Sequence, residues 1–149
     1  MQKRFFNVNG VDRTIIVDPE VMLADVIRKQ MHLTGTKVSC NDGHCGACSV
    51  IMDGKLTLAC VIKMSKVPDN AEIVTVEGIG TPEKPHPVQL ALVAAGAAQC
   101  GFCTPGFVIS LTAHSLSKER STRQKAIASL SGNICRCTGY KSIEKAADN

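Results

Sequence analysis

Eight cysteines are the residues of this chain best suited to chemistry, and they fall into two groups of four. Three cysteines of the first group share the run C-N-D-G-H-C-G-A-C and the fourth follows later: Cys40, Cys45, Cys48 and Cys60. A C-x4-C-x2-C run with a distant fourth cysteine is the spacing of a plant-type [2Fe–2S] ligand loop. Gly43 and Gly46 let the backbone turn several thiolates inward and point N–H groups at sulfur. The pattern predicts a [2Fe–2S] site.

Other uses of these four cysteines match the pattern less well. A structural zinc site usually takes its ligands as two C-x2-C-like pairs, whereas here one tight loop supplies three. A disulfide framework needs an oxidising compartment, and the N-terminus M-Q-K-R-F-F-N-V-N-G lacks the apolar region of a secretory signal. His44 lies between two cysteines, but Rieske-type ligation uses two histidines on one iron. We therefore expect His44 to lie at the loop surface without binding metal.

The second group combines a C-x2-C pair with a distant C-x-C pair: Cys100, Cys103, Cys135 and Cys137. Taken alone, two tight pairs fit zinc and an iron–sulfur cluster nearly equally. C-x-C is the less usual zinc pair, and the first group already favours iron. Both pairs are expected at helix ends, where free N–H groups can meet sulfur and partly offset the negative charge of a cluster. A second iron–sulfur site is the better interpretation.

Composition is that of an ordinary globular chain. Of 149 residues, 44% are hydrophobic and 20% are charged, and the net charge of +4 comes from scattered lysines and arginines. A solvated surface accounts for these charges, so nucleic-acid binding is not indicated. No apolar run approaches the length of a membrane span, and we expect a soluble, cytoplasmic protein whose thiols stay reduced. Aromatic residues make up only 3%, so the core must be largely aliphatic and bound cofactors could help to complete it.

The first half carries the signals of a small sheet crossed by one helix. Two hairpins are predicted, around Asn9-Gly10 and Asp53-Gly54, and a last strand follows them. A helix is expected between the hairpins, capped by Asp18 with Pro19 at its first position and ended by Thr34-Gly35. Leu23, Val26 and Ile27 would form its core face. The expected strands span residues 5–8, 14–17, 49–52, 55–59 and 73–76, a β-grasp arrangement.

The second half is predicted to be helical. The run G-I-G-T-P-E-K-P-H-P is the best linker in the chain. Helices are then expected from Pro87 through V-Q-L-A-L-V-A-A-G-A-A-Q, from Thr104-Pro105 to Leu116, from a Ser121–Gln124 capping box to Leu130, and over residues 142–147. The predicted fold is α+β: a β-grasp, plant-type ferredoxin-like domain (1–78), a linker (79–87) and a four-helix bundle domain (88–149).

The cysteine blocks resemble the iron–sulfur subunit or domain of the molybdenum hydroxylases, the xanthine dehydrogenase and aldehyde oxidoreductase group. The matching segments are C-N-D-G-H-C-G-A-C-S-V, D-G-K with Cys60, H-P-V-Q, A-Q-C-G-F-C-T-P-G-F and G-N-I-C-R-C-T-G-Y. They cover most of the chain in order, and no ligand position departs from the pattern. The short interval from Cys48 to Cys60 also matches this family rather than plant ferredoxins.

This resemblance implies that each group of four cysteines holds one [2Fe–2S] cluster and that the chain is an electron-transfer subunit. Electrons would pass from a molybdopterin centre, in the dinucleotide form, on a large partner subunit, through both clusters, to an FAD-binding medium subunit or another acceptor. Gln99 and Cys137 would reach the pterin. The substrate, an N-heterocycle or an aldehyde, would be oxidised on the partner chain. Without the motif around it, Gln99 would be taken for a solvated amide at a helix end.

The chain by itself shows no catalytic constellation. It has no Walker loop, no G-x-G-x-x-G and no nucleophile–base set, so it should not turn over substrate alone. A free ferredoxin-like carrier and a zinc-stabilised interaction module are the competing function classes. For the subunit interpretation we expect an exposed, small and apolar face to pack on the large subunit, formed by Gly101, Phe102, Pro105, Gly106 and Phe107.

Overall fold

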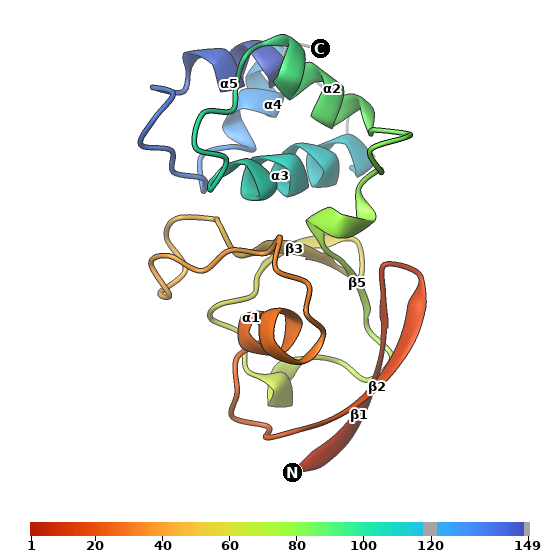
Figure 1. Cartoon of the computed structure of the whole chain (residues 1–149). Coiled ribbons are helices and arrows are strands. Elements are labelled where there is room, and N and C mark those ends of the chain that lie inside the picture. The colour runs from red at the N-terminus through yellow and green to blue at the C-terminus, as the bar shows by residue number, and fades with distance from the viewer. Residues whose placement is uncertain (118–121, 148–149) are drawn as a thin grey trace.

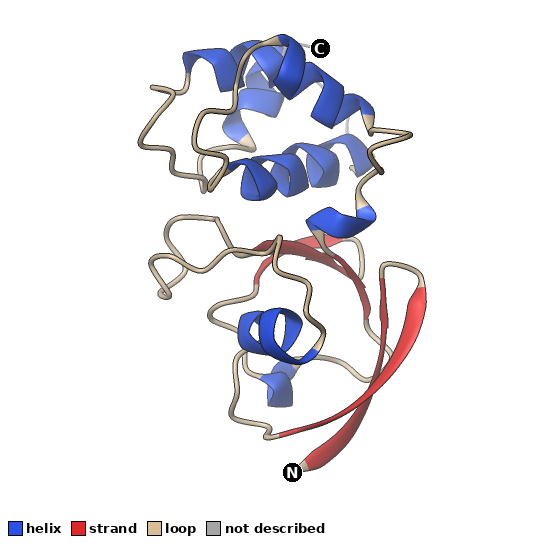
Figure 2. Ribbon diagram, viewed as in Figure 1, coloured by secondary structure: helices blue, strands red, loops and turns tan. Residues whose placement is uncertain are grey.

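The computed structural model describes residues 1–117 and 122–147, with a mixed sheet in the first half and helices in the second (Figures 1 and 2). The sheet has the order β2-β1-β5-β3-β4. β1 and β5 run parallel, and the other neighbours are antiparallel. The strands are β1 (Gln2–Val8), β2 (Val11–Val17), β3 (Ser49–Met52), β4 (Lys55–Leu58) and β5 (Glu72–Val74).

Both predicted hairpins are confirmed. Asn9 and Gly10 have φ angles of 53° and 83°, and Asp53 and Gly54 have 50° and 81°, so each turn has two consecutive left-handed residues. Such turns match the twist of the strands they join. β1 and β2 each begin earlier than expected, at Gln2 and Val11. β5 ends at Val74, because the next residues form the 3-10 helix η3 (Val76–Gly78).

The predicted start of the first helix at Asp18 is wrong. The Asp18 carboxylate accepts a hydrogen bond from the Glu20 amide in a turn, and the carbonyls of Pro19 and Val21 accept from Ser65 and Met64. Because those carbonyls bond to the 3-10 helix η2 (Met64–Lys66), they cannot continue a helix. Helix α1 therefore begins later and spans only Leu23–Asp25.

The same helix also ends before Thr34-Gly35. α1 continues as the π-helical turn η1 (Val26–Gln30), and the Leu33 amide closes it by donating to the carbonyl of Ile27. His32 takes the left-handed φ of 57° that this closure needs. The predicted core face is confirmed, since Leu23, Val26 and Ile27 are fully buried.

The second half contains α2 (Pro87–Ala94), α3 (Thr104–Leu116), α4 (Arg123–Ala128) and α5 (Lys141–Ala147). His86 caps α2 in a capping box with Gln89 that the sequence analysis missed. The predicted cap at Ser121 lies outside the described residues, and Thr122 caps α4 by accepting from the Lys125 amide. α4 ends two residues short of the predicted Leu130.

α2 is shorter than expected and stops before the cysteine pair. Gly96 takes a left-handed φ of 63°, and the Ala97 amide donates to the carbonyl of Leu92, which closes the helix. Gln99 and Cys100 therefore lie on the segment between α2 and α3 and not on a helix.

The helical half packs on the β3 side of the sheet, with α3 facing it (Figure 1). The residues between the two halves share one core, which includes Ile51 of β3 and Phe107 and Leu111 of α3. Ile79, at the start of the predicted linker, is also buried in this core. Within the described residues, no helix is long and apolar enough to cross a membrane.

Candidate metal centres

The first four thiols come from two segments that the sheet brings together. Cys40, Cys45 and Cys48 lie on the loop between η1 and β3, and Cys60 follows β4. The Ala59 amide donates to the carbonyl of Cys48 at 3.3 Å, which holds the end of β4 beside the loop. The hairpin turn therefore delivers the fourth thiol, as predicted from its position after Asp53-Gly54.

Backbone amides of this loop point at sulfur. The N–H groups of His44 and Cys45 each donate to Cys40 Sγ at 3.3 Å. Gly43 and Gly46 have φ angles of 85° and 75°, in the left-handed region that favours glycine, as expected for this loop. Such amides stabilise a thiolate, and they would do the same for sulfur bound to iron.

The inner part of this group is shielded from water. Cys48 and Cys60 are only 1% and 3% exposed. Burial raises the pKa of the Cys48 thiol to about 12, and the neighbouring thiols of Cys60 and Cys45 add to this shift. Because the thiolate is the form that binds metal, a bound metal has to displace the proton of Cys48 and supply the positive charge that stabilises the thiolate.

His44 lies at the loop surface, as expected. Its imidazole is 77% exposed, and Nδ1 is 2.7 Å from the Asp42 carboxylate. The hydrogen bond that the imidazole donates to the Asp42 carboxylate, together with the charge of that carboxylate, raises the pKa of His44. Nδ1 is therefore engaged by a carboxylate.

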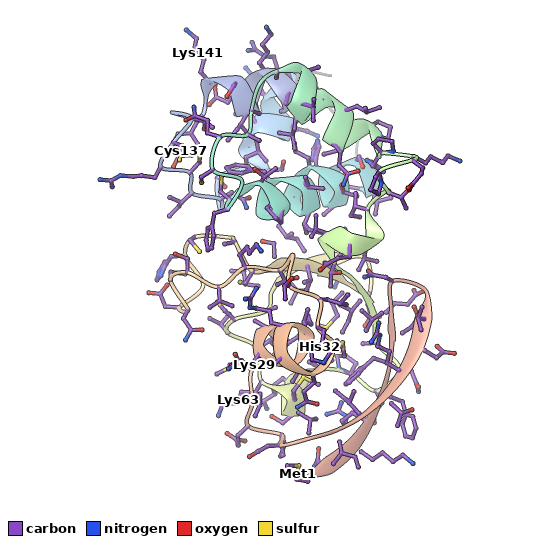
Figure 3. The ribbon with its side chains drawn as sticks, in the orientation of Figure 1. Met1, Lys29, His32, Lys63, Cys137 and Lys141 are labelled. Atoms are coloured by element: carbon purple, nitrogen blue, oxygen red, sulfur yellow. The ribbon has the colours of Figure 1, made fainter. Side chains whose placement is uncertain are left out.

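The second four thiols form two contacting pairs between helices. Cys100 and Cys103 lie before α3, and Cys135 and Cys137 lie between α4 and α5, where Figure 3 labels Cys137 at one edge of the helical half. The Sγ atoms of Cys100 and Cys137 are 3.6 Å apart. Burial raises the pKa of Cys103 to about 12, and a hydrogen bond between the thiols of Cys103 and Cys135 adds to this shift.

Thr138 lies beside the second group, where the sequence predicted free N–H groups that could meet sulfur, and it adds a hydroxyl donor that was not predicted. Its hydroxyl and its amide donate to Cys135 Sγ at 3.2 and 3.5 Å. Burial acts to raise the pKa of Cys135, but these donors outweigh it and lower the pKa to about 7. The Cys135 amide in turn donates to the Tyr140 hydroxyl at 3.0 Å. The T-G-Y residues after the C-x-C pair were the available signal.

This donor set fits a [2Fe–2S] cluster, which takes four thiolates in two pairs. Each group has four thiols from two segments, at least two of them in direct contact, with N–H or O–H donors directed at one sulfur. Among the residues described, no three His, Cys, Asp or Glu side chains are arranged around one point as a single metal ion would require.

The two thiol loops also touch each other, which the sequence did not indicate. The Ile134 amide donates to the carbonyl of Cys45 at 2.9 Å, and Asn133 Nδ2 lies 3.4 Å from the carbonyl of Gly46. Cys45 belongs to the first group, and Ile134 directly precedes Cys135 of the second. The two groups are therefore held by contacting backbone segments.

The predicted apolar face is only partly exposed. Phe102 is 44% exposed and Gly101 is exposed, but Gly106 and Phe107 are buried. Both residues belong to α3: Phe107 packs in the core, and Gly106 lies against the carbonyl of Gly46. The prediction that Gly106 and Phe107 belong to an exposed face is wrong, because a helix that packs on a sheet buries the side that faces the sheet. Gln99, Cys100 and Cys137 are exposed.

Comparison with known proteins identifies both halves as iron–sulfur domains. Residues 6–65 match the family described as "2Fe-2S iron-sulfur cluster binding domain", and residues 75–148 match "[2Fe-2S] binding domain". The chain is 38% identical to the nicotinate dehydrogenase small FeS subunit of Eubacterium barkeri, over 94% of this chain and 88% of that protein. The structure of quinoline 2-oxidoreductase from Pseudomonas putida 86 superposes with a TM-score of 0.92 at 34% identity, covering 99% of this chain and 91% of that one.

Another relative is much longer. Aldehyde oxidoreductase of Megalodesulfovibrio gigas is 49% identical over 98% of this chain, which spans only 16% of that protein. Similarity along nearly the whole chain to such subunits and domains defines the class of protein as a [2Fe–2S] iron–sulfur protein with a ferredoxin-like first half. The chain belongs to the molybdenum hydroxylase family.

Proposed function

We propose that this chain is the electron-transfer subunit, or the corresponding part, of a molybdenum-dependent hydroxylase or dehydrogenase. The observation that carries the proposal is that each cysteine group has thiols in contact and that the loops bearing the two groups touch each other. One [2Fe–2S] cluster would be held by Cys40, Cys45, Cys48 and Cys60, and a second by Cys100, Cys103, Cys135 and Cys137. A bound [2Fe–2S] cluster accepts and releases one electron.

The surrounding residues prepare each site for that role. Amides of His44 and Cys45 and the hydroxyl of Thr138 donate to sulfur, which favours the more negative, reduced state. Cys48 and Cys60 are shielded from water, which keeps solvent from the inner side of the first site. In this proposal residues 1–78 and 88–149 act as two cluster-binding domains, the second a four-helix bundle.

The exposed part of the second site is proposed to face the molybdenum-bearing partner. Cys100 and Cys137 are exposed and adjacent, and Gln99 precedes Cys100 while Phe102 follows it by two residues. Gln99 and Cys137 would contact the pterin of a molybdopterin dinucleotide on a large subunit. The first site would pass electrons to FAD on a medium subunit or to another acceptor. An N-heterocycle or an aldehyde, oxidised on the large chain, is the proposed substrate class.

Anaerobic purification from the native source tests the assignment. We expect a larger chain that contains molybdenum to copurify, and dithionite to produce two distinct [2Fe–2S] EPR signals. Two signals without a molybdenum-containing partner would favour a free electron carrier instead. A colourless protein loaded with zinc would contradict both.

The orientation is tested with Gln99→Ala in the complete complex. Stopped-flow reduction by a panel of aldehydes and N-heterocycles should be slowed, with both clusters still assembled. Gln30→Ala is the control, since Gln30 is also an exposed amide but lies on η1 in the sheet half. Equal reduction rates in both variants, or crosslinks to the large chain only from the sheet half, would contradict the orientation.

A further inference from the structure

Asn133 lies at the junction of the two thiol loops and bonds to both halves of the molecule. Its Oδ1 accepts a hydrogen bond from the Ser110 hydroxyl of α3 at 2.6 Å, and its Nδ2 donates to the carbonyl of Gly46 at 3.4 Å. Its own amide donates to the carbonyl of Leu130. Asn133 is only 7% exposed and Ser110 only 1%, so these polar groups have little access to water. A buried amide without its partners would be costly, which makes this arrangement specific.

The backbones at this junction approach too closely for side chains. A Cβ atom at Gly46 would lie 2.5 Å from the carbonyl oxygen of Gly132 and 2.6 Å from Asn133 Nδ2. A Cβ atom at Gly106 of α3 would lie 2.5 Å from the carbonyl oxygen of Gly46. Two glycines from different halves therefore allow the first loop to lie directly against α3 and the second loop. Gly46 also needs its φ of 75°, which favours glycine independently.

The contact between Asn133 and Gly46 lies close in sequence to cysteines of both groups, which are proposed to hold the clusters. Gly46 follows Cys45, and Asn133 is two residues before Cys135. The hydrogen bond from the Ile134 amide to the carbonyl of Cys45 lies beside the Asn133 contact. A shift at Asn133 would therefore move one group of thiols relative to the other. Electron transfer between two centres depends steeply on their separation.

We infer that Asn133 is a positioning residue that fixes the separation of the two thiol groups, through Ser110 on one side and Gly46 on the other. The inference rests on the proposed function in one respect: the separation of the two thiol groups affects electron transfer only if both groups hold clusters. The junction itself is a property of the polypeptide and can be tested without them.

The test uses Asn133→Asp, Ser110→Ala and Gly106→Ala in the intact protein with its partner chains. Asn133→Asp keeps the side-chain shape but replaces the donor to Gly46 with an acceptor. Ser110→Ala removes only the hydroxyl that donates to Asn133, and it replaces Asn133→Asp in the test if that variant folds poorly. Gly106→Ala forces the Gly46 carbonyl away. Thr112→Val and Gly132→Ala are matched controls: Thr112 Oγ1 of α3 is buried with no hydrogen-bond partner, and a Cβ atom at Gly132 meets nothing within 4 Å.

Two measurements are made on each variant. Dithionite-reduced samples are compared for the magnetic interaction between the two clusters in low-temperature EPR, which falls with the cube of their separation. Hydrogen exchange of the Ile134 amide is measured separately. We expect the three junction variants to change the EPR interaction at full iron and sulfide content, and to speed exchange by about tenfold, the scale of one lost buried hydrogen bond. The controls should match the parent protein.

An unchanged interaction and unchanged exchange in all three junction variants would overturn the inference. Equal effects in the controls would also overturn it, because they would show a general response of α3 or of the loop. If the parent protein contains no iron, the proposed function fails. The exchange of Ile134 then still decides whether Asn133 holds the junction.

Discussion

The amide of Ile134 and the carbonyl oxygen of Cys45 are joined by a hydrogen bond of 2.9 Å across the boundary between the sheet and the helical half. One residue lies within the first thiol loop and the other directly precedes a cysteine of the second. The two thiol groups are formed by different cysteines, but their loops share a backbone contact. Variants at one site can therefore be tested for whether they affect the other.

The bound metal should amount to about four iron atoms and about four labile sulfides per chain, because each group of four thiols matches one [2Fe–2S] cluster. Metal and sulfide analysis of anaerobically purified protein, with a visible spectrum, checks this number. A content of about two iron atoms would mean that one thiol group does not hold a cluster.

Cys45→Ala should remove the first cluster and destabilise the sheet half, while the second cluster remains. The substitution deletes the sulfur but keeps the carbonyl that accepts from Ile134, so the contact between the loops survives. EPR of the reduced protein should show one signal in place of two. Cys137→Ala is the reciprocal variant and should remove only the other signal. Loss of both signals from Cys45→Ala, with the helical half still folded, would contradict the assignment of ligands.

Thr138→Val should make the reduction potential of the second cluster more negative. The hydroxyl donates to Cys135 Sγ at 3.2 Å, and a donor to sulfur stabilises the reduced state more than the oxidised state. Loss of one hydrogen bond worth ~1 kcal/mol corresponds to about 40 mV for one electron. An EPR-monitored redox titration measures the shift. The control is Thr104→Val, because Thr104 follows Cys103 but its hydroxyl has no hydrogen-bond partner.

Arg4→Met should destabilise the sheet half by about 2–4 kcal/mol, the scale for leaving buried polar groups without a charged donor. The Arg4 guanidinium donates to the carbonyls of Met64 and Val67 and to the Asp69 carboxylate, and it ties β1 to the segment around η2. Urea unfolding followed by circular dichroism gives the change. Lys3→Met, at an exposed position of the same strand, should have little effect. Similar losses in both variants would mean that the bonds of Arg4 add little.

Local patterns in the sequence determined much of the molecule. The spacing of the cysteines predicted two groups of four, and the structure places Cys100 beside Cys137, Cys103 beside Cys135 and Cys48 beside Cys60. The N-G and D-G turns predicted both hairpins, and Thr104-Pro105 predicted the start of α3. These features depend on residues close in sequence, whose φ preferences and side-chain spacing act before any tertiary contact forms.

Tertiary contacts decided the remainder. The first helix begins at Leu23 because the carbonyls of Pro19 and Val21 bond to residues around η2, and this outweighs the preference of Asp18 and Pro19 for a helix start. Gly106 and Phe107 are buried because α3 lies on the sheet. The junction of Gly46, Ser110 and Asn133 joins residues far apart in the chain through close backbone approach and buried hydrogen bonds. Such a contact leaves no periodicity or spacing in the sequence, so only the folded structure reveals it.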